Sequence, residues 1–244
     1  MKTLILSSSI FILLAFCACT PKIYLPTPQC APLFGKQGEV QASGEIGSPL
    51  LNLQGAYAAT NHLFIVGDAT SSPTNIQLVA TRFNMLELGG GYYTSTDNDL
   101  RFELQGGAGY GNRYGFGETY TGGFLAPPRH TVYIVNTDYN ELYIQPAIGK
   151  SGDVFGFGFS SRFSYIAFPG FNYQVNYGYE DKRGWDPGNF WQPAAYCTVG
   201  FQNIYGIWQV GYSMPLTGPV LIYGNPVYSY LYFSAGLQVR LFNN

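Results

Sequence analysis

The chain has 244 residues, a formal net charge of −2, and only 11% charged residues. That charge balance excludes nucleic acid as a partner, because no basic surface is left to neutralise phosphates. Glycine (31), tyrosine (21) and phenylalanine (18) are abundant, yet the mean hydropathy is only +0.01. A helical membrane protein would be far more hydrophobic, whereas a membrane barrel averages one apolar and one polar face.

The chain begins with a targeting segment. Lys2 precedes an apolar stretch, Leu4 to Phe16, that is too short to span a bilayer as a helix. A positive residue followed by a short apolar stretch is typical of a signal peptide, which we predict over residues 1–18.

The end of this stretch predicts a lipid anchor. Small Ala18 immediately precedes Cys19, as in a bacterial lipobox, although Phe16 stands where Leu or Val is usual. We predict lipidation of Cys19, with modification of Cys17 and ordinary signal-peptidase cleavage near Ala18 as alternatives. The proline-rich residues 19–36 are then expected to be an extended tether outside the sheet.

Two further cysteines, Cys30 and Cys197, are expected to stay unpaired. The periplasm permits a disulfide, but Cys197 falls in an expected strand and faces lipid there. No CxxC pair or His/Cys cluster indicates a metal site, and we expect no cofactor.

From about residue 38 onward, apolar residues alternate with small or polar ones in segments about ten residues long. In the last segment the odd positions from Leu231 to Leu241 are apolar, and the even positions carry Tyr, Ser, Gly, Gln and Arg. Alternation over that length predicts strands with one lipid-facing side. The expected strands cover residues 37–46, 50–59, 62–70, 84–94, 100–111, 139–150, 153–167, 192–202, 204–214 and 228–242. We predict a single transmembrane antiparallel β-barrel over residues 37–244, with about ten strands and with eight or twelve as alternatives.

The connectors alternate in length. The short ones are residues 60–62, 95–99, 151–152 and 203, and the long ones are 71–83, 112–138, 168–191 and 215–227. Short periplasmic turns and long extracellular loops are typical of outer-membrane barrels, although the short connector 47–49 falls on the long side. An even strand number then places both termini in the periplasm and a lipid on Cys19 in the inner leaflet of the outer membrane.

The inward positions of these strands carry charges of both signs. They are Glu39, Glu45, Glu87, Arg101, Glu103, Glu141, Arg162 and Arg240. Barrels of about eight strands are just filled by their own side chains, so ten strands with Glu–Arg pairs inside predict a closed or nearly closed lumen. Soluble sandwiches, lipocalins and propellers also alternate, but outward phenylalanines would form a very large exposed apolar patch on them.

Five stretches resemble a family of small outer-membrane β-barrel proteins widespread in Bacteroidota, often with a lipoprotein-type N-terminus. They are Ala31–Glu39, Asn52–Leu63, Leu86–Tyr93, Tyr143–Gly149 and Phe157–Tyr165. The resemblance implies a single barrel in the outer membrane and little about function, because that family is largely uncharacterised. Surface lipoproteins of that phylum usually carry acidic residues after the lipidated cysteine, and Thr20-Pro21-Lys22 has none. The resemblance therefore favours a periplasm-facing anchor.

Candidate catalytic residues are few. His62 falls in a tight turn, and His130 lies in an expected long loop with Asp138 nearby. Neither forms a recognisable nucleophile–base pair, so we expect no enzyme activity.

The segment 179–191 is the most concentrated polar and aromatic stretch, and it is a possible partner loop. Its candidate contact residues are Arg183, Trp185, Phe190 and Trp191. Trp and Arg are enriched at binding hot spots, but an interfacial aromatic girdle explains the same composition.

Three classes of function remain. The first is a non-enzymatic structural or accessory subunit of a cell-envelope complex, with outer-membrane lipid and other envelope proteins as partners. The second is a narrow porin-like diffusion channel, and the third is an enzyme at the barrel rim acting on lipid or peptide. We favour them in that order, because paired charges fill a small lumen and a catalytic constellation is lacking.

Overall fold

The computed structural model describes residues 24–47, 51–72, 75–76, 79–96, 98–121, 129–175, 178–180, 185–217, 221–222, 225–226 and 231–241. The expected signal peptide, Cys17, Cys19 and Arg183 lie outside the described residues. Within the described ranges, no helix is long and apolar enough to cross a membrane.

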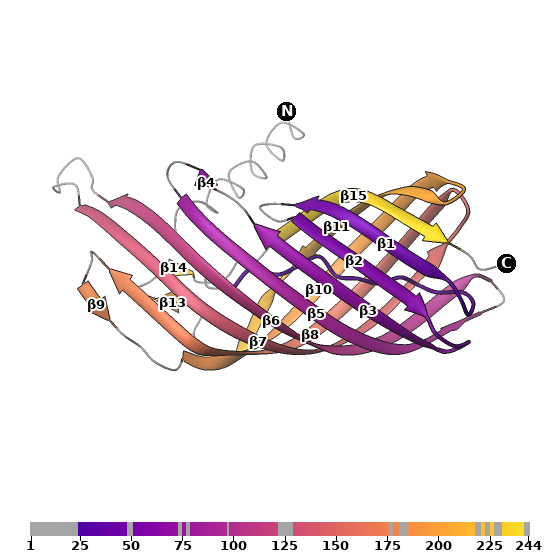
Figure 1. Cartoon of the computed structure of the whole chain (residues 1–244), viewed down its shortest axis with the longest axis horizontal. Helices are drawn as coiled ribbons and strands as arrows, with labels where there is room; N and C mark the ends of the chain where they lie inside the picture. Colours follow the sequence, from indigo (N-terminus) through magenta and orange to yellow (C-terminus); the bar gives the residue numbers. More distant parts are fainter. Residues whose placement is uncertain are drawn as a thin grey trace, which may run out of the picture.

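Ten antiparallel strands pair in a closed ring, which confirms the expected fold (Figure 1). In order around the ring they are β1 (Val40–Gly47), β2 (Leu51–Ala58), β3 (Leu63–Ser72), β5 (Val79–Ser95), β6 (Leu100–Thr121), β7 (Arg129–Ser151), β8 (Phe155–Val175), β10 (Trp185–Phe201), β11 (Ile204–Tyr212) and β15 (Leu231–Leu241). β15 closes the ring onto β1, with Leu241 opposite Val40.

Five short strands extend or flank this ring. β4 (Asn75–Ile76) pairs with β5, β9 (Gly178–Glu180) with β8, and β12 (Met214–Thr217) with β10. β13 (Leu221–Ile222) and β14 (Asn225–Pro226) pair with each other.

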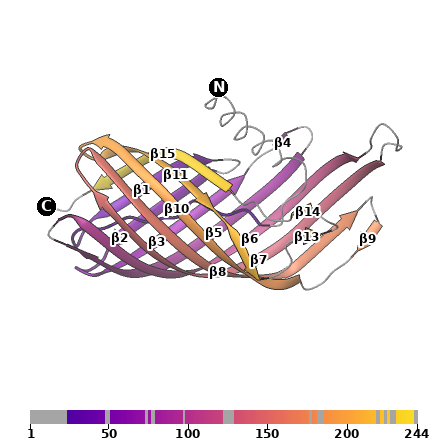
Figure 2. The same ribbon diagram turned by 180° about the vertical axis from the view of Figure 1, so that it is seen from behind.

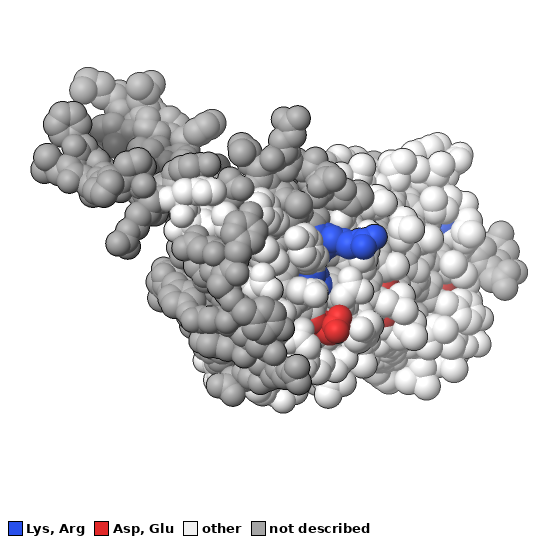
Figure 3. Space-filling view, turned by 60° about the vertical axis from the view of Figure 1, so that its left-hand side comes forward, with Lys and Arg blue, Asp and Glu red and all other residues white. Residues whose placement is uncertain are grey.

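Period-two alternation separates the two faces of the wall. In β6, Leu104 and Tyr110 are exposed on the outside, while Glu103 and Gln105 are buried inside. The outward apolar residues of β6 run from Leu100 to Tyr110, about 33 Å of strand and about 25 Å of height at a tilt of about 40°. That height matches the apolar band of transmembrane barrels. Charged side chains are sparse on the face shown in Figure 3.

The connectors after β2, β5, β7 and β10 are short and lie at one end of the barrel, here called the turn end. β1 begins and β15 ends there (Figure 2). Asp99 and Gln202 adopt positive φ angles of 59° and 57° in two of these turns. Such left-handed residues are common in tight hairpin connections. The opposite end is called the loop end.

Strands β5, β6, β7, β8 and β10 extend much further toward the loop end than the sequence predicts. The expected loop 112–138 is mostly strand, because β6 continues to Thr121 and β7 starts at Arg129. The expected loop 168–191 likewise contains the end of β8, all of β9 and the start of β10. The extension projects beyond the shorter strands (Figure 1). An apolar outer face is needed only in lipid, so the strand boundaries predicted from apolar residues stop too early.

Four inward tyrosines lie directly across from glycines on a neighbouring strand. The pairs are Gly107–Tyr143, Gly111–Tyr139, Gly158–Tyr196 and Gly211–Tyr232. A Cβ at any of these glycines would overlap the tyrosine ring. The rings therefore lie flat against the wall and leave the centre of the lumen free for another occupant.

Candidate functional site in the barrel lumen

The lumen contains the chain's own amino-terminal residues 24–36, here called the lumen segment. Most of its side chains are buried, with Tyr24 and Phe34 both at 0% exposure. The segment is extended and crosses the inside of the barrel (Figure 1). The sequence predicts its extended, non-sheet conformation but assigns it to a tether outside the barrel. Glycines lie opposite four of the inward tyrosines, so these rings lie against the wall and the segment fills the space between them.

Tyr24 fixes the segment at the loop end. Its ring packs against Phe190 with centroids 5.1 Å apart and against Tyr139 with centroids 6.0 Å apart. The surrounding buried cluster includes Phe83 and Phe168. All of these residues lie well away from the short turns along their strands.

Phe34 fixes the segment at the turn end. Its ring lies 5.7 Å from the rings of both Phe64 and Tyr93, which are next to short turns. Gly38 then adopts a φ of 85°, and the chain turns back into β1. The lumen segment therefore runs from the loop end to the turn end. The sequence predicts that both termini lie on the side of the short turns. β15 does end at the turn end, but Tyr24, the first described residue, lies at the loop end.

Four wall glutamines bind the backbone of the lumen segment. They come from β1, β2, β7 and β11, which surround the lumen. Amide nitrogens of the glutamines donate to backbone oxygens as follows: Gln54 to Pro28 (3.1 Å), Gln209 to Gln29 (2.9 Å), Gln145 to Cys30 (2.8 Å) and Gln41 to Pro32 (2.7 Å). Gln209 also accepts from the Gln29 backbone N–H at 2.7 Å.

Charged wall residues bind the backbone nearer the turn end. Arg101 donates to the Leu33 carbonyl at 2.6 Å. Glu103 accepts from the Phe34 N–H at 2.8 Å, and Glu39 accepts from the Gly35 N–H at 3.2 Å. Backbone groups that leave water must find partners, and these contacts supply them without a β-ladder.

Side chains of the segment add further bonds. Gln29 donates to the Gln192 carbonyl at 2.6 Å and accepts from Ser160 at 2.7 Å. Thr27 donates to Glu87 at 3.2 Å, and the Tyr24 hydroxyl accepts from the Gln192 amide at 2.9 Å.

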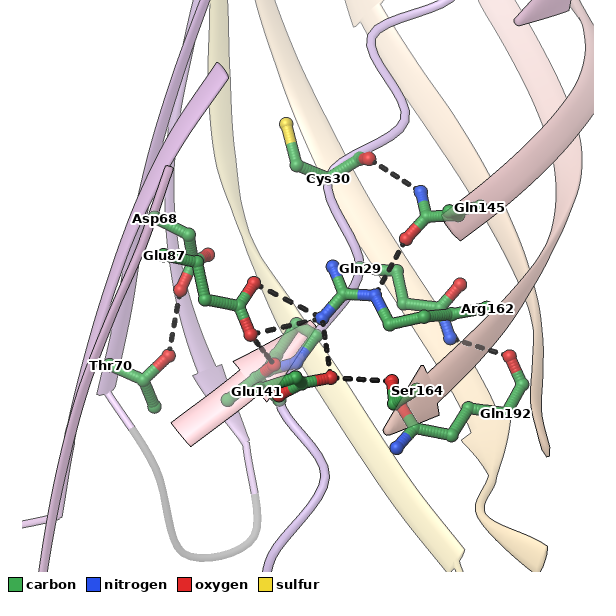
Figure 4. Close-up of polar contacts among 12 residues, drawn as sticks. Gln29, Cys30, Asp68, Thr70, Glu87, Glu141, Gln145, Arg162, Ser164 and Gln192 are labelled. Carbon is green, nitrogen blue, oxygen red and sulfur yellow. Dashed lines mark hydrogen bonds and ion pairs between the residues drawn. The ribbon is translucent and has the colours of Figure 1, made fainter. Parts of the chain in front are cut away.

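Arg162 is the centre of the polar network (Figure 4). Its NH1 lies 3.0 and 3.1 Å from the two Glu87 oxygens and 4.0 Å from Glu141. Its Nε donates to Gln145 at 2.9 Å, and its guanidinium lies 4.2 Å from the centroid of the Tyr143 ring. Because Gln145 also binds the Cys30 carbonyl, this network links three wall strands to the lumen segment.

The structure places the eight sequence-predicted interior charges on the inner face. Seven are buried and Arg101 is half-buried. Within the part of the chain that the structure describes, only Glu87 and Glu141 among these glutamates lie within ion-pair distance of an arginine, as expected. Glu45 instead accepts from Ser234 at 2.5 Å, and Arg240 lies over the Tyr205 ring and donates to Gln238. The sequence alone assigns the glutamines no role, because a neutral amide at an inward position does not by itself indicate a partner. Several such amides, in a barrel that follows an uncharged proline-rich segment, are the signal that points to them.

Of the candidate partner residues, Phe190 and Trp191 have described side chains, and these two lie on opposite faces of β10. Phe190 points inward against Tyr24, so its prediction as a contact residue is wrong. Trp191 is partly exposed, and its indole N–H donates to Ser161 at 2.8 Å. Trp185 begins β10 rather than sitting in a loop. Alternation in β10 explains the split, because neighbouring residues face opposite sides.

The described residues include two cysteines and both histidines. Cys30 is buried in the lumen segment and Cys197 lies in β10, both as free thiols. His62 stacks on Tyr92 with centroids 5.3 Å apart. His130 is exposed within β7, not in a loop. No group of three His, Cys, Asp or Glu residues that could hold a metal occurs in the part of the chain described.

Little space is left around the middle of the lumen segment. A cavity of about 20 Å³ lies beside residues 29–32, against Gln41 and Gln54. A larger one of about 280 Å³ opens at the turn end between Glu39, Arg101 and Arg240. The inner cavity can hold about one water molecule, so it is too small for a solute.

No family model and no curated protein matches the chain, so membership of the Bacteroidota family stays a prediction. Among solved structures, the chain is similar to the outer membrane protease OmpT from Escherichia coli, with 10% identity and a TM-score of 0.49 over 84% of this chain and 94% of that one. It is also similar to the translocator domain of the autotransporter NalP from Neisseria meningitidis, with 11% identity and a TM-score of 0.42 over 84% and 86%. Both TM-scores are below 0.5, so nothing about this chain is inferred from these two proteins. The assignment of a closed barrel depends on the strand pairing of this chain.

Proposed function

We propose that this protein is a non-enzymatic outer-membrane barrel whose lumen is sealed by its own amino-terminal segment, and that it serves as a structural or accessory subunit of the cell envelope. The observation that carries the proposal is the lumen segment itself. It fills the barrel from one aromatic cluster to the other and is bound to the wall along its length. A sealed barrel can anchor and present a surface but cannot pass solutes.

The outer wall supports the outer-membrane location. An apolar outside, a polar inside and closed strand pairing are what a bilayer requires of a β-protein. We assign the short turns to the periplasm and the loop end to the cell exterior, following the usual asymmetry of such barrels. Outer-membrane lipid is then the partner of the apolar wall.

Chain length constrains the predicted lipid anchor. Five peptide steps separate Cys19 from Tyr24, and they span at most about 17 Å. Tyr24 packs on Tyr139, which lies twelve strand residues from the end of β7 at Ser151, about 40 Å along the strand and about 30 Å in height at a tilt of about 40°. A lipid on Cys19 therefore cannot return to the turn end. We propose that the anchor lies in the outer leaflet, not in the inner leaflet that the sequence suggested.

The loop end offers the surface for an accessory role. The outward residues of the projecting strands include more polar side chains than the apolar band below them, with Tyr114 also exposed there. They include Asn84, Asn112, Asn136, Asn140 and Asn172. Hydrated asparagines on a protruding sheet present hydrogen-bonding groups outside the membrane. Co-purification from native membranes in mild detergent is expected to recover a stoichiometric envelope partner. Recovery of the barrel alone would contradict the accessory role and would be consistent only with a structural role.

Planar-bilayer recording tests the sealed lumen against the channel alternative. The full protein is expected to give no steady conductance, because the segment excludes ions from the lumen. Deletion of residues 24–34 provides the matched open control, and Leu104→Ala on the outer wall provides a silent one. Steady ohmic current from single copies of the unaltered protein would favour the channel instead.

A further inference from the structure

The ring of wall strands is complete without the lumen segment. Ten strands close through their own backbone ladders. Residues 25–36 belong to no strand, and Tyr24 forms a single isolated bridge. Apart from that bridge, the segment is held by contacts with wall side chains, as a bound ligand is, and not as part of the sheet.

The wall recognises the segment mainly through its backbone. Pro28, Gln29, Cys30, Pro32 and Leu33 each offer a carbonyl to a wall side chain. Wall oxygens accept backbone N–H groups in return, including that of Phe34. Every peptide carries these groups, so the contacts select an extended chain and not one particular sequence.

Two aromatic pockets set the length and the ends of what can bind. One holds Tyr24 at the loop end and the other holds Phe34 at the turn end, ten residues later. The residues between them carry no charge, and three are prolines. Proline favours an extended conformation and has no N–H that would need a partner. The site therefore suits an uncharged, proline-containing peptide with an aromatic residue at each end.

The wall also has unused hydrogen-bonding capacity beside the segment. The Gln105 side chain is 2% exposed, and both atoms of its amide lack a partner among the described residues. Within those residues the same holds for one oxygen of Glu103 and for the Tyr196 hydroxyl. A lumen shaped only for its resident would leave fewer buried polar groups unpaired, because each one costs stability.

We propose that the lumen is a peptide-binding site, and that residues 24–36 are a tethered occupant that an extended peptide of the same chemistry can replace. Among the described residues, the covalent chain passes from the segment to the ring only at the turn end, through the exposed Lys36 and Gln37. Cutting the chain there converts the tethered occupant into an independent ligand. The proposal goes beyond the sealing role and does not depend on an accessory partner.

The test uses the full-length protein with a protease site inserted between Lys36 and Gln37. After cleavage and dialysis in detergent, mass spectrometry measures release of the resident fragment, and fluorescence anisotropy measures uptake of a labelled synthetic peptide with the sequence of residues 24–36. Saturable uptake is expected only after cleavage. A peptide carrying Tyr24→Ala and Phe34→Ala is expected to bind at least tenfold more weakly.

Wall substitutions locate the binding inside the barrel. Gln145→Ala and Gln209→Ala each remove bonds to the backbone and are expected to weaken uptake several-fold, whereas outward Leu142→Ala is not. Heat-modifiable gel migration checks folding; if a wall variant does not fold, the two peptides still test the site in the unaltered wall. The proposal is overturned if the cut fragment never leaves, or if the emptied barrel binds neither peptide. Conductance of the uncut protein is a separate measurement, so failure here leaves the sealing role standing.

Discussion

Arg162 stabilises the lumen by serving several partners at once. It is 1% exposed, donates from one guanidinium nitrogen to both carboxylate oxygens of Glu87 and lies over the Tyr143 ring. Buried charges are costly unless they are paired and hydrogen-bonded, and a guanidinium offers five donors in a rigid plane. Lysine could not satisfy Glu87 and Gln145 together in the same geometry.

Removal of this cation should destabilise the barrel strongly. Arg162→Ala leaves Glu87 and Glu141 buried with no cation beside them, and the expected loss is about 3–5 kcal/mol in the free energy of unfolding. Urea titration of the refolded barrel, followed by heat-modifiable migration, measures the change. The double variant R162M/E87Q removes both charges of the main pair and should recover much of the loss. Single and double variants of equal stability would contradict this account.

Glycines opposite inward tyrosines make room for the tyrosine rings against the wall. Gly111 faces the ring of Tyr139, which is itself packed among Tyr24, Phe83 and Phe168 and cannot move aside. Gly111→Ala is therefore expected to cost about 1–3 kcal/mol, as overpacking does. Gly55→Ala is the matched control, since a Cβ there meets open space. Equal unfolding midpoints for the two variants would show that Tyr139 yields easily.

At the scale of elements, period two predicts all ten wall strands, because every strand keeps one face on lipid and one on the lumen. The predicted boundaries fail in β6 and β7. There the outer face becomes more polar, but the ladder continues from Asn112 opposite Asp138 to Thr121 opposite Arg129. Backbone pairing outside the membrane does not require an apolar face. Hydropathy therefore marks the lipid-facing part of a strand and not its end.

The lumen segment could not be predicted from its own composition. A proline-rich, uncharged stretch after a cleavage signal has the composition of a linker, and its partners are distributed over strands far apart in the sequence. Gln41 is 9 residues from Pro32, whereas Gln209 is 180 residues from Gln29. The alternation pattern predicts which charged residues point into the barrel. It does not predict that the lumen segment lies beside them, and several of these residues bind that segment.

At the scale of the whole molecule, the orientation of the barrel decides which surface the cell exterior meets. Gln37 is exposed at the turn end, and Asn136 is exposed on the outer face of the projecting part of β7. With a membrane-impermeant maleimide, Asn136→Cys should react in intact cells, while Gln37→Cys should react only after the outer membrane is permeabilised. Native Cys30 is buried and provides no background in the folded barrel. The reverse pattern of labelling would show that the barrel has the opposite orientation in the membrane.

The direction of the lumen segment gives the sharpest prediction at this scale. Tyr24 lies at the loop end and Phe34 at the turn end, so the two ends of the lumen segment lie at opposite ends of the barrel. An epitope inserted directly before Tyr24 should bind antibody on intact cells, whereas the same epitope between Lys36 and Gln37 should need permeabilised cells. A return of the chain to the turn end would require a second peptide strand through the lumen, and the space beside residues 29–32 is only about 20 Å³. Periplasmic epitopes at both positions would mean that the segment does not thread the barrel in cells.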